Sequence, residues 1–286
     1  MTVVAVTGAS GKAGRAVVAD LLAHGYEVLA TDVVGVPGDE GDLGTGLVHA
    51  DVTDYGQAVE ALAGADAVVH LANIPAPGRA TAPETIHRNS AMNLNVFLAA
   101  ARLGLRKVVW ASSETTLGLP FDVPPRYAPV DEDHFPVPTS TYALSKVLGE
   151  EAARHVSDWS GIPFVGLRLS NIFRPEDYAR VPSFQHDAQL RRWNLWGYVD
   201  VRDVAQAVRR GLEGEVAGAS ISIVAAADTV MTRSSASLMA EVFPSVPLRR
   251  EVPGHSTLLA IDGARRLLGY EPEHRWRDHI ADPGQD

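Results

Sequence analysis

A tyrosine and a lysine four residues apart, Tyr142 and Lys146, are the residues of this chain best suited to acid–base chemistry. On a helix, a spacing of four places both side chains on one face, close together. An ammonium group beside a phenol favours the phenolate, so the pair can supply a base near neutral pH although a free tyrosine has a pKa of about 10. Such pairs also occur by chance, so this one gains meaning only from the residues around it.

A glycine-rich turn lies near the start of the chain, between an apolar run and a segment with helical periodicity. Gly8 permits a tight turn, Gly11 lets the backbone approach a pyrophosphate at the positive end of the helix, and Gly14 lets the helix pack closely. This context predicts a dinucleotide site. The turn is not a P-loop, because it is too short and no Ser or Thr follows its lysine. The predicted cofactor contacts here are Gly8, Ser10, Gly11, Lys12, Ala13 and Gly14.

Acidic residues at two later strand ends refine this prediction. Asp32 follows Gly14 by eighteen residues, near the spacing at which a carboxylate binds the adenosine ribose of a dinucleotide. A carboxylate there repels a 2′-phosphate, so the sequence favours NAD over NADP, with Lys12 as the cation that would favour NADP. Asp51 and Val52 are predicted to contact the adenine edge. The alternative for Asp51 is a helix cap shared with the polar residues that follow it.

Several other polar positions are candidates for chemistry. Ser112 and Ser113 end a predicted strand at the edge where ligands gather, so a hydroxyl there can bind a substrate oxygen or simply cap a turn. Asn89 lies within a long predicted helix, where asparagine is a poor helix former and a specific polar role is an open alternative. His70 lies in an apolar strand and is predicted to be a satisfied interior histidine. We predict no metal site.

The elements that must position these residues alternate along the chain. The predicted strands are 2–6, 26–30, 47–50, 67–71, 107–111, 164–169 and 220–224, and the predicted helices are 13–24, 83–103, 142–159, 201–212 and 234–242. Continuous apolar strands separated by helices are typical of a parallel, doubly wound sheet. The predicted fold class is therefore α/β, a Rossmann-type sheet with a small C-terminal substrate-binding region.

The chain is predicted to divide near residue 172. Residues 1–172 form the cofactor domain that carries the serine, tyrosine and lysine, and 173–286 form mostly the substrate-binding region, with elements such as 200–224 returning to the core. A proline-rich loop, 117–138, is predicted to be irregular and to cover the substrate. Residues 174–196 have a mixed composition and are predicted to be irregular and mobile.

Composition excludes several classes of function. The 286 residues are 46% hydrophobic, enough to bury a full core, and carry a formal net charge of −10, which argues against a nucleic-acid surface. The chain contains no cysteine, so thiolate catalysis and zinc–thiolate sites are excluded. We find no leader segment and no apolar run long enough to cross a membrane, and we expect a cytoplasmic protein without a membrane partner.

Together these motifs resemble the extended short-chain dehydrogenase/reductase family over nearly the whole chain. The family's Thr-Gly-x-x-Gly-x-x-Gly turn matches 7–14, its acidic motif matches 51–54, its His-Leu-Ala matches 70–72, and its Tyr-x-x-x-Lys matches Tyr142 and Lys146. The family's Ser-Ser at a fixed distance before a glycine matches Ser112 and Ser113 before Gly118. The resemblance implies a nicotinamide cofactor and redox chemistry.

The resemblance also implies roles for single residues. Ser113 is the catalytic serine, and Asn89 completes a tetrad with Tyr142 and Lys146 by anchoring a water that relays the proton outward. Residues 70–72 and the position after them imply further cofactor contacts at Leu71, Ala72 and Asn73. A homodimer through the helices at 83–103 and 142–159 is expected from the resemblance alone.

Within the family, the chain is most similar to uronate dehydrogenases and aldose 1-dehydrogenases. This similarity implies NAD-dependent oxidation of the C1 hydroxyl of a free sugar to the lactone. An acidic sugar needs cations, for which Arg174 and Arg180 are the candidates, although both can be surface arginines on a loop. The residues predicted to bind sugar oxygens are Ser112, Ser113, Glu114 and Asn171.

Two alternatives remain open at this point. An NAD-dependent sugar-nucleotide epimerase uses the same tetrad without net redox change, and a cofactor-sensing regulator on the same fold has no turnover. Dehydration is disfavoured, because Glu114 is followed by Thr115 where sugar-nucleotide dehydratases carry Asp-Glu.

Overall fold

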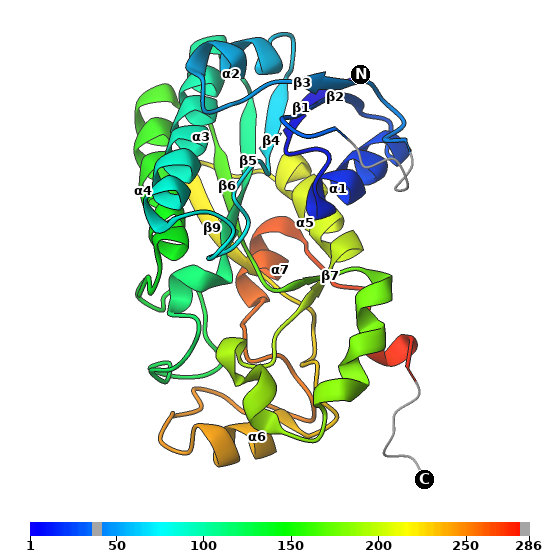
Figure 1. The fold of residues 1–286 in the computed structure, drawn as a ribbon, viewed down its shortest axis with the longest axis vertical. Helices are drawn as coiled ribbons and strands as arrows, with labels where there is room; N and C mark the ends of the chain where they lie inside the picture. The colour runs from blue at the N-terminus through cyan, green and yellow to red at the C-terminus, as the bar shows by residue number, and fades with distance from the viewer. Residues whose placement is uncertain (36–41, 281–286) are drawn as a thin grey trace.

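The computed structural model describes residues 1–35 and 42–280. Across them, seven strands form one sheet in the order β3-β2-β1-β4-β5-β6-β9, and every neighbouring pair is parallel. The predicted parallel, doubly wound α/β fold is thus confirmed (Figure 1). The strands are β1 (Val3–Thr7), β2 (Glu27–Asp32), β3 (Leu47–His49), β4 (Ala67–His70), β5 (Lys107–Ser113), β6 (Phe164–Leu169) and β9 (Ala219–Val224).

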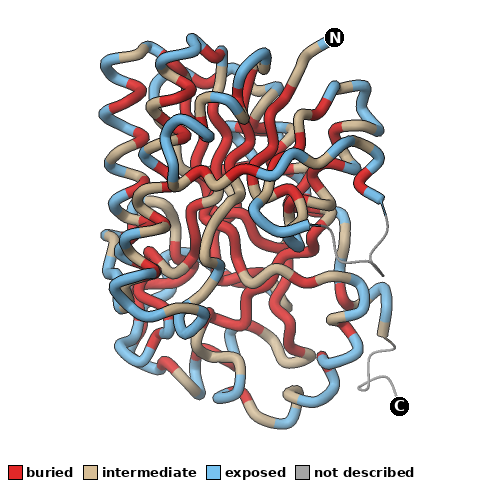
Figure 2. Tube along the Cα trace, turned by 45° about the horizontal axis from the view of Figure 1, so that its top comes forward, coloured by how far each residue is buried: buried red, intermediate tan, exposed pale blue. Residues whose placement is uncertain are grey.

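Helices cover both faces of this sheet (Figure 1). On one face lie α2 (Tyr55–Leu62), α3 (Ala82–Leu103) and α4 (Thr141–Ser160), and on the other lie α1 (Lys12–Ala23) and α5 (Val201–Glu213). The central strands β1, β4, β5 and β6 are largely buried from both sides, which explains their mostly apolar sequences (Figure 2). The core divides accordingly into a cluster around Phe97, Trp110 and Phe164 on the α3–α4 side and a larger one on the other side.

The register of the strands brings their polar carboxyl ends together. Thr7 lies opposite both Thr31 and His70, and Ser113 lies opposite Leu169. Chain order reverses between β1 and β4, so the loops after these strands part and leave a crevice at this edge. Candidate residues at the carboxyl ends of five strands therefore lie around one opening.

His70 is an interior histidine, as predicted. Its ring nitrogens lie 2.7 Å from Thr7 Oγ1 and 3.1 Å from Asn93 Oδ1. Burial lowers the pKa of His70 to about 3, so the ring is neutral and fully engaged within the sheet.

Most residues after β6 form a smaller region below the sheet (Figure 1). It contains a two-stranded parallel sheet of β7 (Ile172–Phe173) and β8 (Val199–Asp200), and also α6 (Ser235–Val242) and α7 (Asp262–Leu268). The stretch predicted to be irregular, 174–196, holds two 3₁₀ helices, η2 (Pro175–Phe184) and η3 (Ala188–Asn194). Helix α5 and strand β9 return to the main sheet.

The proline-rich loop 117–138 has little regular structure, yet it is firmly held. Ala128 and Val130 bridge to Leu248 and Leu259, and Phe121, Ala128 and Val130 are buried. The backbone N–H of Ile223 on β9 donates to Glu132 Oε1 at 2.8 Å. These contacts tie the loop, which was predicted to be irregular, to the C-terminal region. Among the described helices, none has the length and apolarity needed to cross a membrane.

Candidate active site

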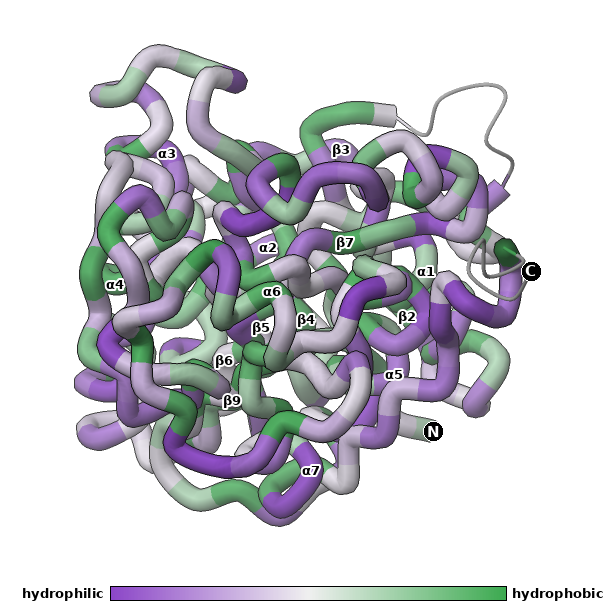
Figure 3. Tube along the Cα trace, turned by 90° about the horizontal axis from the view of Figure 1, so that it is seen from below, coloured by the Kyte–Doolittle hydropathy of each residue, from purple (hydrophilic) through white to green (hydrophobic). Residues whose placement is uncertain are grey.

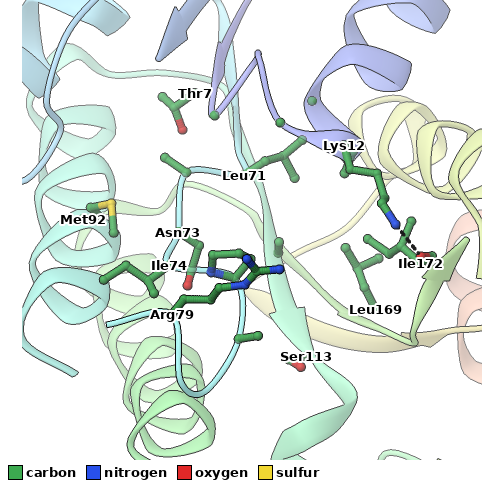
Figure 4. A pocket seen from close by; sticks show the side chains of 18 of the residues that line it. Thr7, Lys12, Leu71, Asn73, Ile74, Arg79, Met92, Ser113, Leu169 and Ile172 are labelled. Atoms are coloured by element: carbon green, nitrogen blue, oxygen red, sulfur yellow. Dashed lines mark hydrogen bonds between the residues drawn. The ribbon is translucent and has the colours of Figure 1, made fainter. Parts of the chain in front are cut away.

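A cavity of about 860 Å³ opens at the carboxyl edge of the sheet (Figure 4). Strands β1, β2, β4, β5 and β6, the turns that follow them and the start of α4 contribute its walls. Every cofactor residue predicted from the sequence lines it, together with Ser113, Tyr142 and Lys146. The lining also includes Ser112, Glu114, Ser170, Asn171 and Trp193.

The glycine turn forms one end of this cavity and leaves no room for side chains. Gly8 has a φ of +74°, and a Cβ there would lie 2.5 Å from the backbone nitrogen of Ala72. A Cβ on Gly14 would lie 2.1 Å from the carbonyl oxygen of Gly8. Helix α1 begins directly after the turn, with no side-chain cap at Gly11. Its free backbone N–H groups therefore face the position of an anionic group.

Asp32 closes the next side of the cavity at the end of β2. Its Oδ2 accepts hydrogen bonds from the backbone N–H of Ser10 at 3.1 Å and from Ser10 Oγ at 2.6 Å. The carboxylate is thereby fixed beside the glycine turn. Asp51 also lines the cavity, but it is not the helix cap: its Oδ1 accepts from Thr53, whereas Asp54 caps α2 by accepting from the N–H of Gln57.

Lys12 is turned away from Asp32. Its Nζ lies 3.1 Å from Asp177 Oδ2 and donates to the carbonyl oxygen of Ile172, also at 3.1 Å (Figure 4). The first residue of α1 is thus connected to η2 across the mouth of the cavity. The side chain is consequently occupied at the position where it would otherwise be available to a 2′-phosphate.

The residues after β4 form the wall beside the glycine turn. Leu71, Ala72 and Asn73 line the cavity, and Asn73 Oδ1 is buried without a hydrogen-bond partner in the protein. An orphaned buried acceptor is a position that a ligand donor can satisfy. With the glycine turn and Asp32, this wall fits a dinucleotide such as NAD: the turn offers N–H groups to a pyrophosphate, and Asp32 offers a carboxylate to a ribose.

Ser113, Tyr142 and Lys146 meet at the other end of the cavity. Ser113 is the last residue of β5, and the serine cap at Ser140 starts α4 so that Tyr142 and Lys146 fall on its buried face. Lys146 is 1% exposed, its Nζ lies 5.6 Å from the centre of the Tyr142 ring, and it donates to the carbonyl oxygen of Ala111 at 2.7 Å. All three residues line the same end of the cavity, and Tyr142 forms a hydrogen bond with Ser113.

The ionisation of this pair differs from the expectation that lysine lowers the tyrosine pKa. Burial raises the pKa of Tyr142 to about 12, opposed by a hydrogen bond with Ser113. Burial also lowers the pKa of Lys146 to about 7, opposed by the charge of Glu150. Desolvation is the largest cause of both shifts, and the ammonium of Lys146 donates to a backbone carbonyl.

Asn89 fastens the wall after β4 to α3. Its Oδ1 accepts from the N–H of Ile74 at 2.9 Å, and its Nδ2 donates to the carbonyl oxygen of Ile74 at 3.2 Å. Nδ2 also lies 3.4 Å from Ser145 Oγ on α4. In this arrangement Asn89 positions the loop that covers the cavity, beside the tyrosine-bearing helix.

Ser112 faces the opposite side of β5 from Ser113. Its Oγ donates to Glu150 Oε1 at 2.6 Å, and Glu150 forms a buried ion pair with Arg168 at 2.8 Å. Alternate residues of a strand point to opposite faces, so only one of two adjacent serines can face the substrate. The hydroxyl of Ser112 is therefore engaged within the protein, and Ser113 is the serine that faces Tyr142.

The predicted anion-binding arginines do not line the cavity. Arg174 lies near Glu176, and Arg180 is an exposed side chain that pairs with Asp177 at 3.0 Å. A different arginine, Arg191, lies behind Asn171 and donates to its Oδ1 at 3.2 and 3.3 Å. Arg191 was not among the residues predicted from the sequence, because its segment has no regular periodicity. The neighbouring aromatic residue Trp193 was the feature that could have drawn attention to this segment.

Comparisons with known proteins agree with this geometry. A sequence model described as "NAD dependent epimerase/dehydratase family" matches residues 4–224. An NAD-dependent glucose-6-phosphate dehydrogenase of Haloferax volcanii is 30% identical over 192 residues, 62% of this chain and 72% of that protein. Tetraketide alpha-pyrone reductase 1 of Arabidopsis thaliana is 29% identical over 276 residues, 86% of this chain and 82% of that protein.

Another relative and a solved structure extend the comparison. An L-arabinose 1-dehydrogenase (NAD(P)(+)) of Haloferax volcanii is 27% identical over 234 residues, 78% of this chain and 87% of that protein. The crystal structure of a UDP-glucose 4-epimerase from Thermotoga maritima superposes with a TM-score of 0.74, at 19% identity, over 97% of this chain and 96% of that one. At that identity the structure supports the fold alone.

Proposed function

The chain belongs to the NAD-dependent epimerase/dehydratase family, and from that premise we propose that it oxidises the C1 hydroxyl of a free sugar to the lactone. The observation that carries the proposal is a single cavity bordered at one end by the glycine turn and Asp32 and at the other by Ser113, Tyr142 and Lys146. A cofactor extended along this cavity brings its reactive end to the serine and tyrosine hydroxyls.

Bound NAD⁺ supplies the hydride acceptor and a positively charged nicotinamide ring. In the proposed reaction Tyr142 accepts the proton of the sugar hydroxyl, while Ser113 donates a hydrogen bond that orients the reacting oxygen. Lys146 holds the nicotinamide ribose and, when protonated, favours the phenolate of Tyr142. Asn89 positions the loop beside α4, and we propose that it also anchors the water that relays the proton outward.

NAD is favoured over NADP by the charges at the adenosine end. Asp32 is held beside the glycine turn by Ser10, where its carboxylate would repel a 2′-phosphate. Lys12, the cation of the turn that would attract such a phosphate, is engaged by Asp177. We propose that Asp51 and Val52 contact the adenine from the next strand end.

A free sugar is favoured over a sugar nucleotide because the described part of the C-terminal region adds no lysine or arginine to the cavity wall. Binding of a nucleotide diphosphate calls for arginine or lysine donors. Among the described cavity-lining residues, Lys12, Arg79, Arg88 and Lys146 are the cations, and all precede residue 172; the C-terminal region contributes Trp193. The relative named as an L-arabinose 1-dehydrogenase supports a reaction at C1, and the relative named as a glucose-6-phosphate dehydrogenase supports oxidation of a sugar.

The test is NADH formation, followed by absorbance, when the purified protein and NAD are mixed with a panel of free aldoses and uronates. We expect stoichiometric NADH from one or more sugars, a lower rate with NADP, and a loss of at least a hundredfold in Tyr142→Phe, because a general base typically contributes that much. Thermal melting and NADH binding of Tyr142→Phe check that its fold and cofactor site are intact. Full activity in Tyr142→Phe would overturn the assignment of the base.

An epimerase is the second candidate, supported by the family description. It retains its cofactor and produces no free NADH. UDP-glucose and UDP-galactose therefore belong in the panel, with interconversion followed by chromatography. Interconversion without NADH would replace the dehydrogenase proposal.

We further propose that two copies associate through the outer faces of α3 and α4. These neighbouring helices carry partly exposed large apolar residues where a solvated face would be polar. The residues concerned are Leu94 and Leu103 on α3 and Leu144, Leu148 and Trp159 on α4. Along α4 hydrophobic residues recur between hydrophilic ones (Figure 3).

A further inference from the structure

Glu114 is a buried carboxyl group in the wall of the reaction site. It follows Ser113 directly, at the point where β5 ends and the 3₁₀ helix η1 (Glu114–Leu117) begins. The residue is 4% exposed and lines the cavity. A carboxyl group so little exposed to water and so close to the reacting centre acts strongly on whatever occupies the cavity.

The partners of Glu114 are neutral. Ser170 Oγ donates to its Oε2 at 2.6 Å, and Asn194 Nδ2 donates to its Oε1 at 3.2 Å. Burial raises the pKa of Glu114 to about 7, opposed by these two donors, by the charge of Arg191 and by a backbone hydrogen bond from Asn171. These hydrogen bonds all come from neutral groups, so the carboxylate keeps a lone pair to spare and has no direct contact with a cation.

The cation nearest to this group is committed elsewhere. Arg191 donates to Asn171 Oδ1 and, at 3.1 Å, to the carbonyl oxygen of Gly197. Its guanidinium is covered by the ring of Trp193, at 4.9 Å, and by the rings of Phe173 and Phe184. Arg191 therefore lies behind the wall, where it fixes the amide of Asn171 and cannot form a bidentate pair with a substrate anion.

The rest of this wall is also without a free cation. Among the described lining positions from 111 to 193, Glu114 and Lys146 are the charged ones, and Lys146 is engaged by the carbonyl oxygen of Ala111. The amide of Asn171 is held by Arg191 through its oxygen, so its NH₂ group remains as a donor to a sugar oxygen. The wall thus presents a carboxyl acceptor and an amide donor, a combination suited to hydroxyl groups.

We propose that Glu114 selects a neutral sugar: its carboxyl group accepts a hydrogen bond from a ring hydroxyl of an uncharged aldose and disfavours an anionic sugar such as a uronate. The inference rests on the proposed oxidation at C1 and names the substrate class for that site. A hydroxyl donates to a carboxylate with a strong, charge-assisted bond, whereas two like charges in a poorly hydrated cavity repel each other. Asn171, held by Arg191, supplies the complementary donor.

The experiment compares matched sugars that differ in charge. Galactose is paired with galacturonate and glucose with glucuronate, and glucuronamide serves as a neutral compound of nearly the same shape as glucuronate. We expect the wild-type kcat/KM to favour each neutral sugar over its uronate by about tenfold or more, since a like charge opposes binding. Glucuronamide should behave like the neutral members of the series.

Glu114→Gln keeps the shape and removes the charge. We expect the ratio of neutral to anionic kcat/KM to fall about tenfold in this variant, mainly through a lower KM for the uronate. Glu132→Gln is the matched control. Glu132 is a partly buried carboxyl group that accepts a hydrogen bond from the N–H of Ile223 and does not line the cavity. Its replacement should leave the ratio unchanged. Thermal melting and NADH binding are measured for both variants.

The outcomes separate this inference from the proposed function. Efficient oxidation of uronates by the wild type, or an unchanged ratio in a folded and active Glu114→Gln, would overturn the role of Glu114 while leaving the dehydrogenase intact. If Glu114→Gln does not fold, the wild-type ratios and glucuronamide still decide the question. If no sugar yields NADH, binding is compared by the thermal shift of the NADH complex. A rise in melting temperature with neutral sugars alone would support the selection of neutral sugars by Glu114. No rise with any sugar would overturn both this selection and the proposed oxidation of a free sugar.

Discussion

At the scale of single residues, burial determines the ionisation of the proposed catalytic pair. Lys146 has a folded-state pKa of about 7 against an ordinary value of 10.5, so the unfolded chain binds this proton more tightly than the folded one. This difference lowers the free energy of unfolding by its full amount below pH 7, and the reduction disappears as the pH rises towards 10.5. Each unit of the shift corresponds to about 1.4 kcal/mol. A residue needed for chemistry is therefore expected to destabilise the fold at neutral pH.

Replacing Lys146 by methionine should consequently stabilise the protein while abolishing turnover. At pH 7 we expect a gain of roughly 1–3 kcal/mol in the free energy of unfolding, after loss of the bond to Ala111, and a gain that shrinks towards pH 10. Denaturant melts of the cofactor-free protein between pH 6 and 10 measure this. Lys107→Met is the control, because Lys107 also donates to backbone carbonyls, at Leu212 and Gly214, but is less buried. A pH-independent loss in Lys146→Met would contradict the argument.

The residues that line the proposed cofactor end of the cavity were predictable from the sequence, because the glycine spacing and the strand ends that place them are visible there. Gly8 and Gly14 leave no space for a Cβ, and Asp32 ends a strand whose apolar run is visible in the sequence. The partners of Glu114 were not predictable. Ser170 and Asn194 lie 56 and 80 residues away along the chain. The register of β5 and β6 brings Ser170 beside Glu114, and the packing of the C-terminal region brings Asn194 to η1.

At the scale of elements, the sheet and its long helices followed from periodicity, whereas the segment between β6 and β8 did not. The 3₁₀ helices η2 and η3 have three residues per turn and η2 contains an internal proline, so neither shows the apolar spacing of an α-helix. Their positions are set instead by side chains that reach across the molecule. Lys12 in α1 and Asp177 in η2 form one such link, with Arg180 as a second partner of the same carboxylate.

This link is predicted to slow the release of the cofactor. Lys12→Met should raise the NADH dissociation rate about two- to fivefold, in line with the modest strength of a partly exposed ion pair, and should change stability little. Stopped-flow displacement of NADH measures the rate. Raising the salt concentration should accelerate release from the wild type more than from the variant.

Arg180→Met provides the matched control for the link. It removes a cation from the same Asp177 without freeing the glycine turn, so the dissociation rate should stay at the wild-type value. Equal acceleration in both variants would mean that the charge around Asp177 matters and the connection between α1 and η2 does not.

At the scale of the whole molecule, the two regions are joined over a broad surface. The loop 117–138 is bridged to the C-terminal region, α5 and β9 belong to the main sheet, and one hydrophobic cluster continues from α1 into the residues around Trp196 and Trp276. Rigid packing of this kind holds the cavity walls at a fixed separation. We therefore expect ligands to enter and leave through changes in local contacts, such as the ion pair between Lys12 and Asp177.

The outer faces of α3 and α4 lie outside this packing, and they are the surfaces through which we propose that two copies associate. Leu148, in the middle of α4, is 45% exposed. Leu148→Glu would place two charges in a symmetric interface, since a two-fold axis brings the same surface of both copies together. We expect the wild type to be a dimer of the 30.5 kDa chain at micromolar concentration and Leu148→Glu to be a monomer. Sedimentation equilibrium distinguishes these states.

Leu190→Glu is the control for this last prediction. Leu190 on η3 is 47% exposed, similar to Leu148, but belongs to a different surface, so its replacement should leave the dimer intact. A monomeric wild type would show that these leucines are covered by nothing in solution. A dimer that resists Leu148→Glu but is lost in Leu190→Glu would move the interface to the C-terminal region, beside the 3₁₀ helix that carries Arg191 and Asn194. In that case association would reach the substrate wall directly, and the specificity assigned to Glu114 would depend on protein concentration.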